Sequence, residues 1–307
     1  MGWACSDHDF LSMPKSSLAR GWRGYLGLLH PGPSLVCTAV TTVAGWSASR
    51  QPDPLRCTSD RWPLKLGWAS AAMAFAQVST GVLNDAFDAP WDRLWQPYKP
   101  IARGVVPRHQ AWLIGFGCGG ASLLCARRAG VPAFRLMLLG LGSGWSYSLG
   151  LSRTPLSFLP FAAGLATVPL LGPAAVGVDL PARGQVALLA AGLGLGLHLA
   201  NGGPDIEQDR RAGRRSLPVL LGDGGSRCAS QLLLSAGAVV VGLGSPERGR
   251  GWARGGAGAC AALVLADRIW PGRSRAHGGH PFVIPTLAGG ALAVGWLLSR
   301  SRTAGAR

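Results

Sequence analysis

Long apolar stretches, separated by short polar segments, recur along the whole chain. A membrane helix needs about 20 mostly apolar residues to cross about 30 Å of hydrocarbon, and nine stretches meet this requirement. Because they take up most of the 307 residues, the pattern predicts an all-α polytopic membrane protein without a separate soluble domain. The predicted spans run approximately over residues 25–49, 64–83, 109–126, 130–150, 155–178, 184–202, 226–245, 252–270 and 280–299.

The polar ends and connectors suggest how the chain is divided and inserted. We expect an N-terminal cytoplasmic segment over 1–24, a membrane domain over 25–299 and a C-terminal tail over 300–307. The first segment lacks a continuous apolar run, so a cleavable signal peptide is not expected. With the N-terminus inside, the inner connectors hold slightly more Lys and Arg than the outer ones, which favours this orientation.

Composition supports the membrane prediction and narrows the functional classes. Hydrophobic residues make up 48% of the chain and charged residues 14%, against roughly 25% charged in ordinary soluble domains. The net charge of +16 is not a nucleic-acid signal, because the basic residues sit in short clusters between apolar stretches. The seven cysteines form no Cys-x-x-Cys pair and predict no zinc or disulfide framework. Only three of the 30 basic residues are lysine, which suggests a GC-rich genome and a bacterial plasma membrane.

Acidic residues are rare, and they are not scattered at random. Of the 14 Asp and Glu residues, six fall in two short windows, 85–92 and 205–209. Both windows belong to the pattern N-x-x-x-D-x-x-x-D-R, which recurs four spans apart and therefore on the same side of the membrane. The pattern is formed by Asn84, Asp88 and Asp92 in the first motif, and by Asn201, Asp205 and Asp209 in the second.

The spacing of these residues has a chemical meaning. Positions i, i+4 and i+8 lie along one stripe of a helix, so each motif is expected to project into a cavity, facing the other. Converging carboxylates repel one another unless a cation joins them, and oxygen ligands select Mg²⁺ or Mn²⁺. Two facing acidic stripes predict metal ions that hold a diphosphate between them. Pro90 and Pro204 lie inside the motifs and are expected to bend the stripes. The alternative is that these are solvated acids capping helix ends.

Basic and aromatic residues near the motifs fit the same site. Lys99 follows the first motif, Arg210 follows the second, and Arg153 lies in the short turn between the fourth and fifth spans. These cations could bind a departing diphosphate, although the positive-inside rule also places such residues in connectors. Tyr147 and His198 are weaker candidates for the same cavity, since polar residues inside spans often form interhelical hydrogen bonds.

Three segments together resemble the UbiA superfamily of intramembrane prenyltransferases. NDAFDAPWD followed by KPIARG is similar to the first aspartate-rich motif of that family, and DIEQDRRAGRRSLPVLLG to the second. YSLGLSRTPLSFLP resembles the Tyr and basic turn between spans four and five. The resemblance covers roughly residues 20–300 and implies a helical bundle around a central cavity that opens to lipid.

The resemblance also implies roles for individual residues. Asp85 would orient its neighbours, and Lys99 and Arg153 would hold the diphosphate. We expect Asp85, Lys99, Arg153 and Tyr147 to be the catalytic residues, and Arg210 to bind the diphosphate as well. Gly202 departs from the family pattern, in which several relatives carry Asn or Asp. The ligands of Mg²⁺ and the diphosphate would be Asn84, Asp88, Asp92, Asn201, Asp205 and Asp209.

The implied reaction is transfer of a polyprenyl group through an allylic carbocation to an acceptor, for which an aromatic or quinone precursor is the first expectation. A membrane terpene cyclase would use the same ionisation step without an acceptor. An ion-coupled transporter would also place acids in broken membrane helices. The sequence leaves chain length, acceptor and oligomeric state open.

Overall fold

The structure, a computed structural model, describes residues 24–50, 61–178, 183–245, 247–269 and 283–301. Most of the expected N-terminal segment and most of the C-terminal tail therefore lie outside the described residues. The described part is all-helical, as predicted, and contains nine long helices. These are α2 (Pro31–Ser49), α3 (Trp62–Trp95), α4 (Arg108–Ala129), α5 (Val131–Leu149), α6 (Phe158–Ala175), α7 (Arg183–Gly202), α9 (Leu217–Gly244), α10 (Arg250–Ile269) and α12 (Val283–Ser301).

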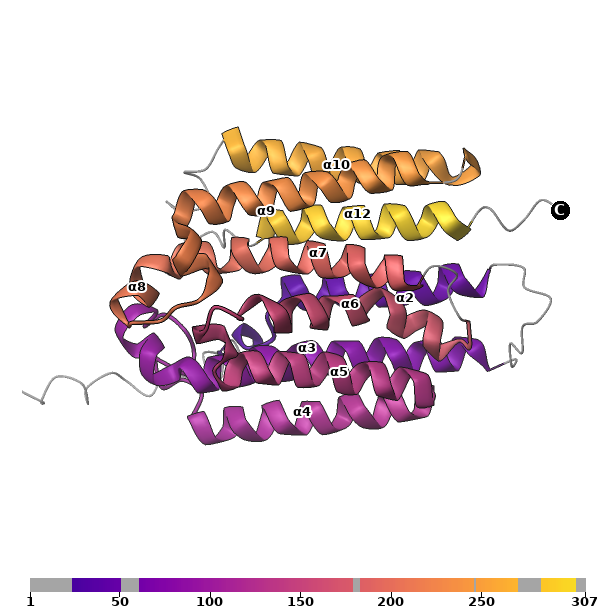
Figure 1. Ribbon diagram of the computed structural model, residues 1–307. Helices are drawn as coiled ribbons and strands as arrows, with labels where there is room; N and C mark the ends of the chain where they lie inside the picture. Colours follow the sequence, from indigo (N-terminus) through magenta and orange to yellow (C-terminus); the bar gives the residue numbers. More distant parts are fainter. Residues whose placement is uncertain (1–23, 51–60, 179–182, 246, 270–282, 302–307) are drawn as a thin grey trace, which may run out of the picture.

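The long helices lie side by side as a bundle (Figure 1). Helices α3, α4 and α5 form one side, α9, α10 and α12 form the other, and α2, α6 and α7 lie between them. Short elements join them near one end of the bundle, namely η1 (Leu151–Arg153), η2 (Gly203–Asp205) and α8 (Ile206–Arg211). A further short turn, η3 (Glu247–Gly249), precedes α10.

Small residues allow the central helices to approach closely. A Cβ atom added to Gly172 of α6 would lie 2.1 Å from the carbonyl oxygen of Thr41 in α2, so only glycine fits there. The Thr41 hydroxyl donates a buried hydrogen bond of 2.9 Å to the carbonyl oxygen of Val168. Such contacts are typical of membrane bundles, in which close packing and interhelical hydrogen bonds replace burial from water.

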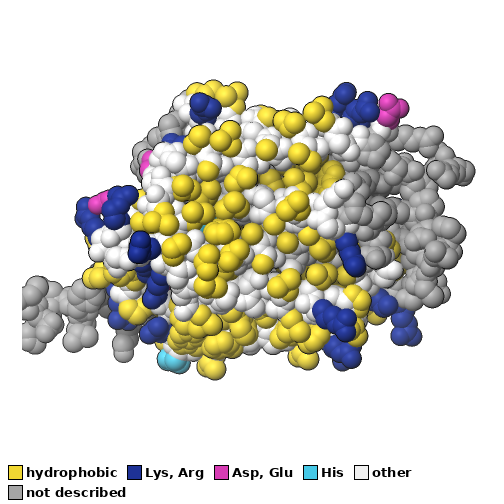
Figure 2. Space-filling view, viewed as in Figure 1, with side chains coloured by type: hydrophobic (Ala, Val, Ile, Leu, Met, Phe, Trp, Pro, Cys, Tyr) yellow, Lys and Arg dark blue, Asp and Glu magenta, His cyan; other side chains and the backbone are white. Residues whose placement is uncertain are grey.

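The surface has the character expected of a protein within a bilayer. Hydrophobic side chains cover the middle of the face in Figure 2, while most Lys and Arg side chains lie toward its edges. Helices α3, α6 and α9, and the continuous segment Arg183–Arg211, are long and apolar enough to cross a membrane. The protein is an integral membrane protein.

The two acidic motifs differ in backbone structure. Helix α3 has 34 residues and a length of about 51 Å, which exceeds the roughly 30 Å of hydrocarbon, so it carries the first motif beyond the expected span. It remains helical through Pro90. Because proline has no backbone N–H, the Ala86 carbonyl lacks its usual partner within the helix. It accepts a 2.8 Å hydrogen bond from Arg108 Nε instead. The second motif is broken, because α7 ends at Gly202 and the chain turns through η2 into α8.

Candidate active site

A polar cavity of about 100 Å³ lies where the two motifs face each other. The first motif reaches it from α3, and the second reaches it from the end of α7, from η2 and from α8. Lys99, Tyr147 and Arg214 also line it. The structure therefore brings to one cavity all six residues of the repeated pattern, namely Asn84, Asp88, Asp92, Asn201, Asp205 and Asp209.

Lys99 connects two buried carboxylates of α3. Its Nζ lies 3.1 Å from Asp85 Oδ1 and 3.0 Å from Asp92 Oδ2, and both aspartates are 2% exposed. Burial alone would lower the pKa of the Lys99 ammonium, but the two carboxylates more than offset this and raise the pKa above its usual range. Lys99 is therefore a permanent cation at the cavity wall. It neutralises one carboxylate inside the repeated pattern and one beside it.

Asp88 faces cations from two other segments. Arg153, in the turn between α5 and α6, and Arg214, after α8, each place a guanidinium nitrogen 3.5 Å from Asp88 Oδ1. Arg214 also lies 2.9 Å from Asp209 Oδ1 and is largely buried, whereas the Arg153 side chain is 48% exposed. Arg214 thus lies between the motifs, and Arg153 lies at the rim.

A second bridge between the motifs comes from Gln96. Gln96 directly follows α3, and its side-chain nitrogen donates a 3.1 Å hydrogen bond to Asp205 Oδ1. The amide oxygen of Asn84 in turn accepts a hydrogen bond from the Ser148 hydroxyl at 3.5 Å. The side chains of the cavity are therefore positioned by groups from α3, α5 and the segment after α8.

Arg210 lies apart from this arrangement. Its guanidinium donates to Glu207 at 2.9 Å, and the side chains of both residues are more than half exposed. The cavity lining contains Arg214 and Gln208 from the same region but not Arg210. Helix α8 has six residues, and Arg210 and Glu207 lie on its exposed side.

Tyr147 lies where the polar cavity meets a larger apolar one. The second cavity has a volume of about 360 Å³ and extends between α2, α3, α5, α6, α7 and α12. Asn84, Tyr147 and Asn201 line both cavities. The Tyr147 ring packs edge to face against Phe161 and His198, with centroids 5.4 and 5.8 Å apart. A ligand could therefore place an anionic head among the motifs and an apolar tail among the helices.

His198 serves to position the loop that follows the second motif. Its Nε2 lies 2.9 Å from the Ser157 hydroxyl, which also accepts a 3.0 Å hydrogen bond from the backbone N–H of Leu217. Ser157 precedes α6, and Leu217 begins α9. The contact thus fixes the start of α9 next to the turn that carries Arg153.

The carboxylates form a donor set that fits Mg²⁺ only together with a ligand. Within the described residues, no three His, Cys, Asp or Glu side chains are grouped closely enough to hold a metal by themselves. Instead, the carboxylates lie on two sides of the cavity with cations between them. Mg²⁺ commonly takes one or two carboxylates and completes its octahedron with water and phosphate oxygens, so the oxygen-only set suits a metal that arrives with a diphosphate.

Comparison with known proteins identifies the family. The model of the UbiA prenyltransferase family matches residues 34–279, which is most of the chain. The chain belongs to the UbiA prenyltransferase family. The match includes both acidic motifs and every residue that lines the polar cavity, so the cavity is part of the UbiA-type domain.

Relatives and solved structures agree with this assignment. The chain is 27% identical over 222 residues to digeranylgeranylglyceryl phosphate synthase of Natronomonas pharaonis, covering 71% of this chain and 74% of the relative. It is 32% identical over 213 residues to the protein of the same name in Halobacterium salinarum, covering 65% and 70%. A UbiA homologue from Archaeoglobus fulgidus, solved bound to GPP and Mg²⁺, superposes with a TM-score of 0.61 at 18% identity, covering 90% and 98%.

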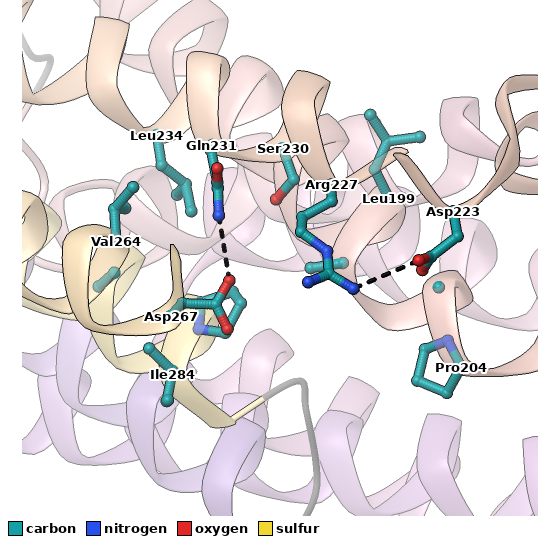
Figure 3. A pocket seen from close by; sticks show the side chains of 14 residues that line it. Leu199, Pro204, Asp223, Arg227, Ser230, Gln231, Leu234, Val264, Asp267 and Ile284 are labelled. Carbon is teal, nitrogen blue, oxygen red and sulfur yellow. Dashed lines mark hydrogen bonds and ion pairs between the residues drawn. The ribbon is translucent and has the colours of Figure 1, made fainter. Parts of the chain in front are cut away.

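Another, smaller cavity lies behind the second motif of this UbiA-type bundle (Figure 3). It has a volume of about 60 Å³ and is bounded by α9, α10, α12 and the end of α7. Asp267, an acid within the predicted eighth span, accepts a 3.3 Å hydrogen bond from Gln231, and Arg227 pairs with Asp223. The first contact connects α9 with α10 and the second lies within α9, so these polar groups pair with one another, which is the common role of polar residues in membrane spans.

Proposed function

We propose that this chain transfers a prenyl group from a prenyl diphosphate to a lipophilic acceptor within the membrane. The observation that carries the proposal is the junction of a polar cavity, lined by both acidic motifs, with an apolar cavity at Asn84, Tyr147 and Asn201. A prenyl diphosphate has the matching chemistry, with a charged head and an unsaturated hydrocarbon tail. Membership of the UbiA prenyltransferase family supports this activity.

The head of the substrate would be held by oxygen ligands and cations. Bound Mg²⁺ would supply Lewis-acid stabilisation of the charge that develops on the diphosphate. We assign its ligands, together with the phosphate oxygens, to the six residues of the repeated pattern. Arg214 and Arg153 would contact the diphosphate directly, since their guanidinium groups already lie near Asp88 and can form charge-assisted hydrogen bonds.

Lys99 and Asp85 would act mainly through their neighbours. Because Lys99 binds both Asp85 and Asp92, it fixes the end of α3 and adds positive charge beside the leaving group. Arg210 pairs with Glu207 and faces away from the cavity. We therefore assign it no direct contact with the bound diphosphate, only a role in attracting the anionic head to the cavity.

The tail would lie in the apolar cavity, where the allylic carbocation is protected from water after the C–O bond breaks. The Tyr147 ring lines both cavities, and we assign it the stabilisation of the cation through its face. A nucleophilic atom of the acceptor then attacks the cation, and the acceptor loses a proton.

The acceptor stays a prediction. An aromatic or quinone precursor was expected from the sequence, whereas the haloarchaeal relatives named above carry the name of a glyceryl phosphate synthase. Both acceptor types present a hydroxyl group or an activated carbon to the cation. We therefore propose that the acceptor belongs to one of these two classes.

One experiment tests the function and separates its alternatives. Purified protein is incubated with geranylgeranyl diphosphate and Mg²⁺, alone or with geranylgeranylglyceryl phosphate or a dihydroxynaphthoate, and diphosphate release and lipid products are measured. A transferase releases diphosphate and forms an adduct that depends on the acceptor. A hydrocarbon or alcohol formed without acceptor would identify a cyclase. Absence of diphosphate release under all conditions, with substrate-dependent ion flux in vesicles, would identify a carrier and contradict the proposal.

We also propose that the motif side faces the cytoplasm, in a bacterial plasma membrane. The excess of Lys and Arg in connectors on that side supports this orientation. With nine spans, a reporter fused after residue 307 would lie on the opposite side. Alkaline phosphatase fused there is expected to be active, and an inactive phosphatase fusion with a fluorescent GFP fusion would reverse the orientation.

A further inference from the structure

His30 has an unusual backbone conformation at the edge of the apolar cavity. It directly precedes α2, with φ 43° and ψ 61°. Within the described residues it is the one non-glycine residue with positive φ. A side chain in this left-handed region is strained, and such strain persists where the surroundings impose it, often at functional sites.

Two contacts hold the imidazole of His30 in place. Its Nε2 lies 2.9 Å from Oδ2 of buried Asp85, whose other oxygen is 3.1 Å from Lys99 Nζ. The ring also lies against Gly81, one turn before Asp85 on α3. A Cβ atom at Gly81 would come within 2.6 Å of the His30 ring, so a glycine is needed to seat the imidazole.

The contact with Asp85 determines which ring nitrogen is free. A carboxylate only accepts hydrogen bonds, so Nε2 carries the proton and donates it, which leaves Nδ1 as an acceptor with a lone pair. No described residue forms a hydrogen bond with Nδ1. His30 lines the apolar cavity together with Asn84 and Tyr147, and its side chain is 41% exposed. The Asp–His pair therefore offers a basic nitrogen at the wall of the substrate cavity.

Prenyl transfer releases a proton that a basic group can accept. When the C–O bond of the donor breaks, the diphosphate leaves with the electron pair, and the new bond forms between the allylic carbon and the acceptor. The acceptor then carries one proton too many, which must leave. Among the described residues that line the cavity, Tyr147 and Cys37 also carry ionisable groups, but tyrosine and cysteine ordinarily keep their protons at neutral pH, whereas histidine does not.

We propose that His30, oriented by Asp85, accepts the proton that the acceptor loses during prenyl transfer. This inference rests on the proposed function, because it assigns a role in the second half of that reaction. It makes a specific distinction between the two halves. Ionisation of the prenyl diphosphate depends on the acidic motifs, whereas capture by the acceptor depends on His30.

Two substitutions test the roles of the two ring nitrogens of His30 separately. His30→Gln can keep a donor near the position of Nε2 for Asp85 but lacks a basic nitrogen. His30→Asn tolerates the left-handed backbone but is too short to keep the Asp85 contact. Donor binding and adduct formation are measured for each, with geranylgeranyl diphosphate as donor and geranylgeranylglyceryl phosphate or a dihydroxynaphthoate as acceptor.

We expect His30→Gln to keep donor binding within about threefold of wild type and to lower adduct formation by about 100-fold. Asp85 accepts the hydrogen bond that orients the His30 ring, so Asp85→Asn should lower adduct formation as well.

Two outcomes would overturn the assignment. Adduct formation by His30→Gln at the wild-type rate would exclude His30 as the base. Equal loss of donor binding and adduct formation in both variants would show that His30 only supports the fold. If wild-type protein itself forms no adduct with either acceptor, the proposed transferase function fails as well, so the two failures are distinguishable.

Discussion

Arg214 reaches from the segment after the second acidic motif to Asp88 in the first, with 3.5 Å between a guanidinium nitrogen and the carboxylate. The same side chain binds Asp209 at 2.9 Å, and its guanidinium lies 5.0 Å from the centre of the Trp91 ring. One largely buried cation therefore lies between the carboxylates of the two motifs. It lowers their mutual repulsion and is available to a diphosphate that enters between them.

Arg214→Gln should lower diphosphate release by roughly 100-fold, because it removes a preorganised cation from the leaving group. Arg211→Gln is a suitable control, since Arg211 lies three residues away and pairs with exposed Glu207. The measurement is the rate of diphosphate release at saturating geranylgeranyl diphosphate and Mg²⁺. Similar rates for the two variants would mean that Arg214 serves only to connect the motifs.

The carboxylates themselves can be tested by isosteric changes. Asp88→Asn and Asp205→Asn should each reduce diphosphate release by at least about 100-fold while the protein stays folded, because each change removes a negative charge that balances Mg²⁺. Glu207→Gln makes the same chemical change within the second motif, at a side chain that is 59% exposed and faces away from the cavity. It should retain most activity. Full turnover by Asp88→Asn or Asp205→Asn would refute the metal assignment.

Much of this architecture follows from local patterns in the sequence. The bilayer requires long apolar helices, so the nine long helices of the described residues were predictable from hydropathy. The period of the helix places Asn84, Asp88 and Asp92 on one stripe, and α3 continues far enough to keep that stripe intact. Pro90 was expected to bend α3, and its effect is limited because Arg108 pairs with the carbonyl that the proline leaves free.

The contacts between distant segments could not be predicted in this way. Gln96 and Asp205 are 109 positions apart, and Asp88 and Arg214 are 126 apart. Such pairs depend on how connectors fold over the end of the bundle, which helical periodicity does not determine. The same limit explains why Arg210 was expected near the diphosphate, although it is Arg214 that lines the cavity, and why His30 was overlooked.

Lys99 predicts a pH dependence of stability. Its pKa is raised in the folded protein, so its contribution is complete below the unfolded value of about 10.4 and is lost as pH rises through the folded value. Lys99→Met leaves two buried carboxylates without their cation and should destabilise the protein by about 3–5 kcal/mol. Lys65→Met, at the other end of α3, is the control.

Thermal unfolding in detergent measures this effect. The difference in Tm between wild type and Lys99→Met should be largest at about pH 8 to 9, where Asp85 and Asp92 are charged in both proteins, and shrink above about pH 10.4. Equal Tm values for the two proteins at neutral pH would show that Lys99 does not stabilise the folded protein through Asp85 and Asp92.

The contributions of the Tyr147 ring and of its hydroxyl can be tested separately. If the ring face stabilises the carbocation, Tyr147→Phe should keep activity within a few-fold, whereas Tyr147→Leu should lower kcat by about threefold to thirtyfold. The rate is measured with one donor at saturation, so that binding does not contribute. A larger loss in Tyr147→Phe than in Tyr147→Leu would assign the role to the hydroxyl.

The length of the apolar cavity predicts a limit on the prenyl tail. Met73 and Asn84, which lie 11 positions apart on α3, both line it, so it extends for roughly 16 Å along that helix. Gly164 of α6 lines the same cavity, and a Cβ atom there would have its nearest neighbour, the Ser143 Cβ, at 3.7 Å. A larger side chain at Gly164 can therefore be accommodated, and it would take up space that the tail needs.

Gly164→Leu should retain turnover with geranyl diphosphate and lower kcat/KM with geranylgeranyl diphosphate by at least about tenfold. Gly120→Leu on α4 is the matched control, because a Cβ atom there meets nothing within 4 Å and the position is exposed on the outside of the bundle. The ratio of kcat/KM for the two donors is the quantity to compare, since it cancels differences in the amount of active protein. An unchanged ratio in Gly164→Leu would mean that the tail leaves the polar cavity by another route, between the helices and directly into lipid.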